Sequence, residues 1–153
     1  MDQAVTDHFN DYYVGQTESY ARTISETDIV LFSGVSGDDN PVHLNEIYAA
    51  ESFFKGRIAH GMLTASYIST VIGTKLPGPG TIYLGQNLTF WAPVRAGDTV
   101  TATVTIKAID PEKRRLTLTT NCTVGDETVI EGEALVMLPL PEDAKATEKG
   151  APA

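Results

Sequence analysis

Two neighbouring segments in the second half of the chain alternate apolar and polar residues with a period of two. The apolar positions of the first segment are Val100, Ala102, Val104, Ile106 and Ala108. The same period resumes at Leu116, Leu118, Thr120, Cys122 and Val124. Successive side chains of a strand point to opposite faces of a sheet, and the Asp-Pro-Glu-Lys stretch between the segments favours a turn. The alternation therefore predicts a half-buried antiparallel hairpin, whose apolar face another element has to cover.

Three further segments have the composition of strands. They cover residues 18–24, 81–91 and 128–138. Residues 60–74 form the most apolar helix candidate, and the Leu-Pro-Gly-Pro-Gly stretch that follows it stops the helix because prolines cannot donate to the helical ladder. The order of one strand, then helices, then a long antiparallel meander predicts an α+β fold in which helix 60–74 covers the sheet.

Two shorter helices are expected before residue 60. Ser25 with Asp28 three positions later resembles a capping box, which opens a helix that ends at Gly37. Asn45 caps a second, short helix that breaks at Gly56. The apolar face of that second helix is expected to consist of Ile47, Tyr48, Ala49, Phe53 and Phe54.

The length and composition fit one domain. A chain of 153 residues, 42% of them apolar, can bury one substantial core. Residues 1–15 are polar and irregular, and residues 141–153 are rich in Ala, Glu, Lys and Pro. We therefore expect a flexible N-terminus over 1–15, a folded domain over 16–140 and a disordered tail over 141–153.

Charge and composition exclude several classes of function. The 20 acidic and 11 basic residues give a net charge of −9, which repels the phosphates of nucleic acids. No apolar stretch reaches the roughly 20 residues of a membrane span, and the first residues carry no signal core, so a cytoplasmic protein without membrane partners is expected. Cys122 is the single cysteine, which excludes an internal disulfide and a thiolate metal site, and its place on the apolar phase of a strand predicts a core residue.

The residues with acid–base chemistry gather in one short segment. Ser-Gly-Asp-Asp-Asn-Pro-Val-His places Asp38 and His43 on a loop between two helices, and a carboxylate and an imidazole that meet at one water have the right chemistry for hydration. Two alternatives remain open at this level. Asp38 and Asn40 could serve only as turn and cap residues with His43 as a structural side chain, or Asp38, His43 and His60 could bind a metal, although no histidine pair with helical spacing supports this.

Longer stretches of the sequence resemble a known family. The string Gly-Asp-Asp-Asn-Pro-Val-His is followed, 17 residues after His43, by His-Gly-Met, and then by LPGPGTIYLGQNLTFWAPVRAGD. This pattern resembles the MaoC-like, R-specific enoyl-CoA hydratases, whose signature contains Asp, any residue, Asn-Pro, an aliphatic residue and His. The similarity runs from about residue 15 to 140. It implies a hot-dog fold, in which an antiparallel sheet wraps around a long central helix with an extra helical overhang, and it implies a homodimer.

The resemblance also implies a role for each site residue. Asp38 and His43 match the signature Asp and His and are the implied catalytic pair. The backbone N–H of Gly61 is the implied donor to the thioester carbonyl, and Asn40 and His60 are implied to shape the substrate site. Two serines of the central helix are implied to line that site as well, namely Ser66 and Ser69.

The implied reaction is the reversible (R)-specific hydration of trans-2-enoyl-CoA to (R)-3-hydroxyacyl-CoA, without a cofactor or a metal. Asp38 draws a proton from water, His43 relays a proton to the α-carbon, and Gly61 stabilises the enolate-like oxygen. Such a reaction links β-oxidation intermediates to polyhydroxyalkanoate (PHA) metabolism. The CoA phosphates need local cations on this acidic protein, and the candidates are Lys55, Arg57, Lys75 and Arg95.

Three rival functions are weighed against this one. A dehydratase acting on acyl carrier protein uses the same site in reverse, and its acidic carrier requires a basic docking patch. A hot-dog thioesterase often carries a carboxylate on the central helix, whereas residues 60–74 contain no Asp or Glu. A non-catalytic module that binds acyl thioesters would have no need of both Asp38 and His43.

Overall fold

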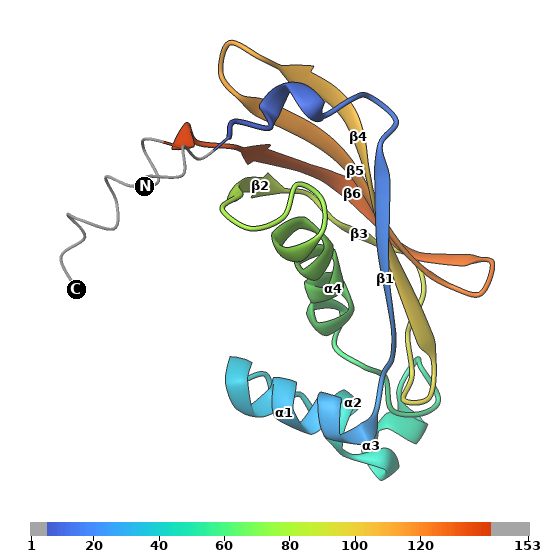
Figure 1. Cartoon of the computed structure of the whole chain (residues 1–153). Coiled ribbons are helices and arrows are strands. Elements are labelled where there is room, and N and C mark those ends of the chain that lie inside the picture. Colours follow the sequence, from blue (N-terminus) through green and yellow to red (C-terminus); the bar gives the residue numbers. More distant parts are fainter. Residues whose placement is uncertain (1–5, 142–153) are drawn as a thin grey trace, which may run out of the picture.

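The structure, a computed structural model, describes residues 6–141 and consists mainly of one antiparallel sheet (Figure 1). The strands are β1 (Thr17–Thr23), β2 (Ile82–Gln86), β3 (Thr89–Phe90), β4 (Thr99–Asp110), β5 (Arg115–Val124) and β6 (Glu127–Met137). Their order in the sheet is β1-β4-β5-β6-β2, and β3 also pairs with β6. The predicted hairpin is confirmed as β4 and β5, whose partners include Val104 opposite Thr120.

One long helix, α4 (Gly61–Thr74), packs on the inner face of the sheet, against β1, β4 and β5 (Figure 1). Its inward side chains are buried and include Leu63, Tyr67, Ile68, Val71 and Ile72. They meet the alternating positions of the hairpin, of which Val100, Ala102, Val104, Leu116 and Leu118 are fully buried. The predicted α+β fold with a covering helix is therefore confirmed, and Cys122 is a core residue as expected.

Three shorter helices gather at one end of the sheet: α1 (Glu26–Ser36), α2 (Pro41–Leu44) and α3 (Glu46–Glu51) (Figure 1). The predicted capping box is present, because Ser25 Oγ accepts from the N–H of Asp28 and the Asp28 carboxylate accepts from the N–H of Ser25. Gly37 ends α1 with a φ of 78°, in the left-handed region that favours glycine. Residues 37–40 leave the helix there and lead into the site.

The apolar face predicted for the short helix is confirmed for Ala49 and wrong for Ile47 and Tyr48, which are exposed. The helix ends at Glu51, so Phe53 lies in the following loop and is 90% exposed. Ile47 is 81% exposed, and the small cluster beneath α3 contains Ala49 with only Val42, Ile58 and the half-buried Phe54. A helix of six residues buries one narrow strip, and the other apolar side chains remain on the surface.

The predicted strand 81–91 is two strands. The register of β2 shifts between Tyr83 and Gly85, and the chain leaves the ladder before β3. Asn87 turns its carbonyl oxygen against Gly132 of β6, where a Cβ atom would overlap with it. Such an irregularity bends a strand and shifts the alternation of its side chains by one residue.

The first described residues pack on the sheet, unlike the flexible segment expected over 1–15. Phe9 lies in a short 3-10 turn (Phe9–Asp11), is 5% exposed and lies 4.6 Å beneath the guanidinium of Arg114, which also pairs with Asp7. Residues 1–5 and 142–153 lie outside the described part, so the expectations for both ends and the limits of the domain stay predictions. Within residues 6–141 no helix is long and apolar enough to cross a membrane, and the cytoplasmic location stays a prediction.

Candidate active site

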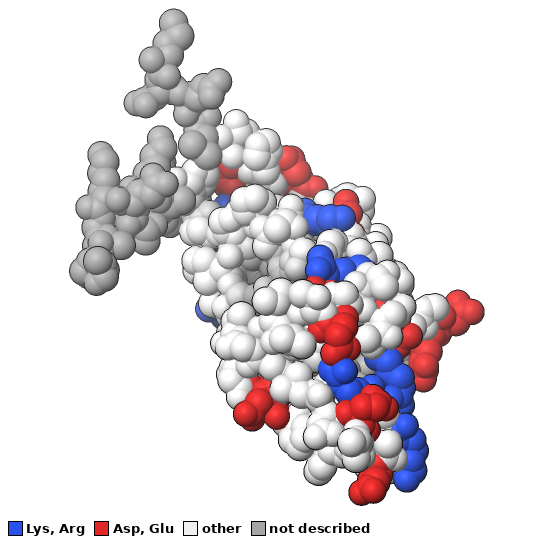
Figure 2. Space-filling model, turned by 90° about the horizontal axis from the view of Figure 1, so that it is seen from below, with Lys and Arg blue, Asp and Glu red and all other residues white. Residues whose placement is uncertain are grey.

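A cavity of about 560 Å³ opens where the helical end meets the start of α4. Its polar wall comes from Asp38, His43, His60 and the start of α4 at Gly61. Apart from Thr64, the rest of its wall is apolar and includes Phe53, Phe54, Ile58, Met62, Phe90, Trp91 and Ile130. Seen from this end, much of the surface is uncharged, and most charged side chains gather toward one side (Figure 2). The cavity therefore suits a mainly apolar ligand with one polar reacting group.

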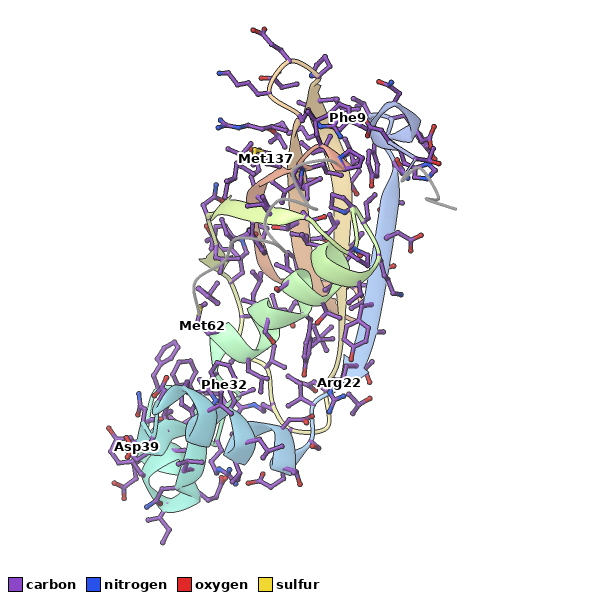
Figure 3. The ribbon with its side chains drawn as sticks, turned by 60° about the vertical axis from the view of Figure 1, so that its left-hand side comes forward. Phe9, Arg22, Phe32, Asp39, Met62 and Met137 are labelled. Atoms are coloured by element: carbon purple, nitrogen blue, oxygen red, sulfur yellow. The ribbon has the colours of Figure 1, made fainter. Side chains whose placement is uncertain are left out.

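The loop before α2 positions Asp38 through local hydrogen bonds. Asp38 accepts from the N–H of Asn40 through Oδ1 at 3.2 Å, and Asn40 in turn caps α2 by accepting from Val42. Oδ2 is thereby left to face His43. Asp39 is exposed and lies at the outer edge of the helical end, away from α4 (Figure 3), which agrees with its assignment to the free position of the signature.

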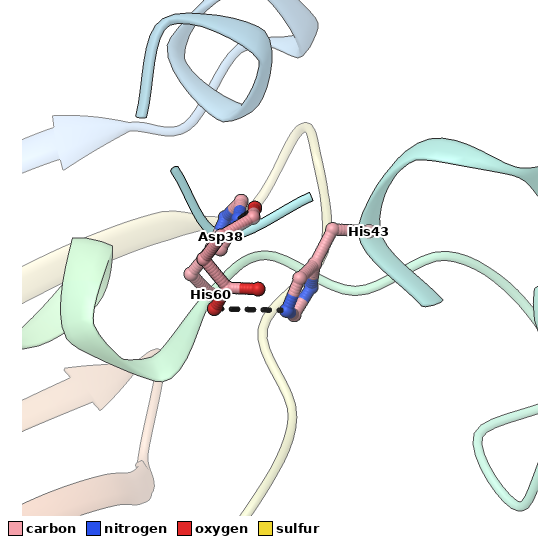
Figure 4. Close-up of side chains that lie close together, drawn as sticks. All are labelled: Asp38, His43 and His60. Atoms are coloured by element: carbon pink, nitrogen blue, oxygen red, sulfur yellow. Dashed lines mark hydrogen bonds and ion pairs between the residues drawn. The ribbon is translucent and has the colours of Figure 1, made fainter. Parts of the chain in front are cut away.

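His43 turns one nitrogen to the main chain and the other to Asp38 (Figure 4). Its Nδ1 lies 2.9 Å from the carbonyl oxygen of Ile58. Because a carbonyl oxygen only accepts, Nδ1 carries the proton in the neutral ring and Nε2 has a free electron pair. Nε2 lies 4.0 Å from Asp38 Oδ2, and the two side chains are 9% and 52% exposed.

Burial is the main influence on the protonation of His43. It lowers the pKa of His43 below 6.5, and the neighbouring His60 and Arg57 act in the same direction. The Ile58 carbonyl and the Asp38 carboxylate oppose this shift in the pKa. The neutral imidazole is consequently the dominant form at pH 7, so Nε2 is available as a base.

The gap between Asp38 and His43 fits one water molecule. A separation of 4.0 Å is too long for a direct hydrogen bond. An oxygen at a normal distance of about 2.8 Å from both atoms would see them at an angle of roughly 90°, close to the angle between hydrogen bonds of water. Both atoms can accept a proton at neutral pH, so a water held there would be activated from two sides.

His60 lies behind this pair. Its ring is stacked on His43 with a centroid distance of 3.8 Å and an interplanar angle of 28°, and its Nε2 lies 2.9 Å from the backbone oxygen of Asp38 and 3.1 Å from Ser33 Oγ. Asp38, His43 and His60 offer possible metal-ligand atoms within 4.8 Å of one another. The stacking opposes a shared ion, because the electron pairs of nearly parallel rings do not converge at about 2.1 Å from one point.

The other expected site residues divide into two groups. Gly61 starts α4 at the cavity wall, and its N–H has no hydrogen-bond acceptor within residues 6–141. Ser66 and Ser69 lie on an exposed side of α4, and neither lines the cavity; Ser66 donates to the carbonyl of Leu63. Asn40 holds the loop and does not line the cavity either. The substrate roles of these last three residues stay predictions.

Three of the four candidate cations are held by internal partners. Arg57 pairs with Glu26 at 2.5 Å and donates to the carbonyl of His43, Arg95 donates to two main-chain carbonyls, and Lys75 donates to the carbonyl of Ser19. Lys55 is exposed and directly follows Phe53 and Phe54 of the cavity wall. Lys55 is therefore the candidate best placed for a phosphate.

The aromatic wall of the cavity was not predicted from the sequence. Phe90 lies against Gly61 so closely that a Cβ atom on Gly61 would be 2.6 Å from the ring. Trp91 follows it and is 62% exposed. The available signal was an aromatic pair at the end of a strand followed by Pro93, since large apolar side chains at a strand end, outside the alternating pattern, often face a ligand.

The comparisons with known proteins agree with this geometry. The MaoC like domain model matches residues 14–129. An (R)-specific enoyl-CoA hydratase of Rhodospirillum rubrum is 58% identical over 138 residues, which cover 90% of this chain and 96% of the relative. A 3-hydroxybutyryl-CoA dehydratase of Methylorubrum extorquens is 50% identical, with 90% and 87% covered.

A solved structure shows the same fold. The (R)-hydratase from A. caviae involved in PHA biosynthesis superposes with a TM-score of 0.80 and 43% identity, covering 84% of this chain and 98% of that one. The hot-dog fold that the motif implied is thereby confirmed. The chain belongs to the MaoC-like family and is similar to (R)-specific enoyl-CoA hydratases within it.

Proposed function

We propose that this protein catalyses the reversible, (R)-specific hydration of trans-2-enoyl-CoA to (R)-3-hydroxyacyl-CoA, as a hydro-lyase without a cofactor. The observation that carries the proposal is the 4.0 Å separation of Asp38 Oδ2 and His43 Nε2 on the wall of an apolar cavity, next to Gly61. The names of the relatives, which include a hydratase and a dehydratase of CoA thioesters, support both directions of the reaction.

The chemistry follows from the position of the water. Its oxygen adds to the β-carbon while the Asp38–His43 pair takes one of its protons, and the pair then returns a proton to the α-carbon on the same face of the substrate. The pair ends in its starting charge state, and its titration is a property of both groups. Negative charge develops on the thioester oxygen meanwhile, and the N–H of Gly61 at the positive end of α4 is placed to stabilise it.

The substrate is a fatty enoyl chain on CoA. The apolar wall of the cavity accommodates the acyl chain, and short or medium chains fit its volume of about 560 Å³. The A. caviae relative, an (R)-hydratase involved in PHA biosynthesis, supports a role that links β-oxidation intermediates to polyhydroxyalkanoate precursors. A thioesterase is disfavoured because α4 carries no acidic side chain, so Asp38 is the one carboxylate among the described residues of the cavity wall.

We also infer a homodimer formed through the edge strand β2. All five of its residues are exposed or half-exposed, and apolar side chains lie on both of its faces, with Ile82, Tyr83 and Leu84 about 40% exposed. A free apolar edge pairs readily with a second copy. Light scattering after gel filtration should give twice the chain mass, and Leu84→Lys should shift the protein toward the monomer. A wild-type protein of single-chain mass would contradict the inference.

The proposed activity is tested by following the ultraviolet absorbance of crotonyl-CoA, because hydration removes its conjugated double bond. The wild type should remove the absorbance in the presence of a chelator and release no free thiol. Asp38→Asn and His43→Gln should fold with the wild-type oligomeric state and lose activity by about 100-fold or more. Near-normal turnover in either variant would contradict the mechanism, thiol release would indicate a thioesterase, and activity on carrier-bound substrates alone would indicate the acyl-carrier-protein dehydratase.

A further inference from the structure

Both residues of the reacting pair contact one buried residue, His60, Asp38 through its backbone oxygen and His43 through its ring. His60 is 2% exposed and sits at the cap position before α4, but its side chain does not cap the helix. Instead the ring fills the space between α1 and the loop of residues 37–40. There the ring of Phe32 lies against the ring of His60, with a centroid distance of 4.8 Å. Figure 3 shows Phe32 at this junction of α1 and α4.

The hydrogen bonds of His60 fix its tautomer. The backbone oxygen of Asp38, 2.9 Å from Nε2, can only accept, so Nε2 carries a proton and donates it. Ser33 Oγ, 3.1 Å from the same nitrogen, steadies the ring from α1. Nδ1 is buried without a hydrogen-bond partner in the described part of the chain. A proton at Nδ1 would have no acceptor there, so the surroundings favour the tautomer that carries its proton at Nε2.

The stacking of His60 on His43 fixes the orientation of the His43 ring. The two rings lie 3.8 Å apart and nearly parallel, which leaves His43 no room to turn toward His60. The Ile58 carbonyl holds Nδ1 of His43 at the same time, so its Nε2 remains directed at Asp38. The position of the Asp38 main chain and the orientation of the His43 ring thus both depend on the imidazole of His60.

We propose that His60 is a positioning residue, which sets the distance between Asp38 and His43 by donating to the Asp38 backbone and by stacking on the His43 ring. The inference rests on the proposed function, because it assigns the geometry of that site. This role differs from shaping the pocket, because His60 contacts both members of the reacting pair, Asp38 through the hydrogen bond and His43 through the stacking. It predicts that kcat depends on His60 more strongly than KM does.

Two variants of similar size separate the hydrogen bond from the ring. In His60→Gln the side-chain amide reaches the position of Nε2 and can still donate to the Asp38 oxygen, whereas in His60→Asn the shorter amide cannot reach it. A displacement of the reacting groups by about 1 Å costs roughly 100-fold in rate. We expect His60→Asn to lower kcat by about 100-fold with KM changed less than threefold, and His60→Gln to keep kcat within about tenfold of the wild type.

Nuclear magnetic resonance of the histidine nitrogens gives a readout that does not need turnover. Wild-type His43 should show a protonated Nδ1, and His60 a protonated Nε2. Both variants remove an ionisable neighbour that lowers the pKa of His43, so the titration of His43 should move to higher pH in both. The other groups that face His43, namely Asp38 and Arg57, are unchanged in both variants.

The outcomes are distinguishable. A wild type that hydrates no enoyl-CoA contradicts the proposed function, while the tautomers of His43 and His60 still decide the positioning. Equal kcat in the wild type and in a folded, dimeric His60→Asn overturns the inference and leaves the function standing. An unfolded His60→Asn is replaced by Ser33→Ala, which removes the second support of the same ring and should lower kcat by several-fold; unchanged kcat there would also overturn the inference.

Discussion

Replacing Gly61 by alanine should damage the site through the ring of Phe90. A Cβ atom on Gly61 would lie 2.6 Å from Cε1 and 2.8 Å from Cδ1 of Phe90. Carbon atoms pack at about 3.5 Å or more, so the ring or the start of α4 has to move by about 0.9 Å. Alanine keeps the backbone N–H and its φ is not restricted here, since Gly61 is not among the residues with positive φ. The steric contact is therefore the whole perturbation.

A displacement of this size predicts a loss of about 100-fold in kcat/KM for crotonyl-CoA hydration. The crowding should also lower the free energy of unfolding by about 1–3 kcal/mol, measured by urea denaturation. Gly73→Ala is the matched control in the same helix, because nothing lies within 4 Å of a Cβ atom at that position. It should keep full activity and gain up to about 1 kcal/mol of stability.

Removing the ring decides whether this reasoning holds. Gly61→Ala combined with Phe90→Ala should return kcat/KM to that of Phe90→Ala alone, because the partner of the clash is gone. A double-mutant cycle measures this coupling directly. Additive losses would refute the reasoning, since they would mean that alanine at position 61 harms the site without contacting Phe90.

Four further predictions concern other parts of the molecule. The acidic limb of kcat/KM against pH should have its midpoint below 6.5, because burial lowers the pKa of His43. Activity is lost as the pH falls through the pKa of His43 and Nε2 becomes protonated. A midpoint above 6.5 would contradict the effect of burial. Lys55→Gln should raise KM for crotonyl-CoA about three- to fivefold and leave KM for crotonyl-pantetheine, which lacks the nucleotide phosphates, unchanged. Phe9→Ala should lower the free energy of unfolding by about 3–5 kcal/mol in urea, whereas a change below 1 kcal/mol would show that residues 6–15 are dispensable. Burial raises the pKa of the Cys122 thiol to about 12, so a thiol-reactive disulfide should label it only after denaturation, and rapid labelling of the native protein would contradict its burial.

The parts of the site that the sequence predicts are those built by local interactions. Asp38, Asn40 and His43 lie within six residues, and turn and cap chemistry alone brings them together. The capping box at Ser25 and the end of α1 at Gly37 are local in the same sense. Such features depend on residue type and spacing, which the sequence displays directly.

The remaining parts depend on contacts between distant residues. The Ile58 carbonyl that fixes the tautomer of His43 lies 15 residues away, and the bond from His60 to the Asp38 backbone spans 22 residues. The Phe90 contact needs the register shift inside β2, between Tyr83 and Gly85, and the composition of residues 81–91 does not show that shift. Hydrophobicity likewise predicted a buried face for α3, although the six-residue helix covers a cluster too small to bury Ile47.

The geometry of the reacting pair is held by main-chain groups rather than by the attraction between the two side chains. Asp38 Oδ1 accepts from the N–H of Asn40, and His43 Nδ1 donates to the carbonyl of Ile58. Asparagine at position 38 can keep the first of these bonds through its own Oδ1, while an amide nitrogen takes the place of Oδ2. The variant therefore removes a negative charge and a proton acceptor from an almost unchanged site. It also removes a charge that raises the pKa of His43, so the imidazole stays neutral over a wider range of pH. A loss of turnover in Asp38→Asn consequently measures the acceptor that the water has lost, because the Ile58 carbonyl still holds His43 and removal of the charge only favours its neutral form.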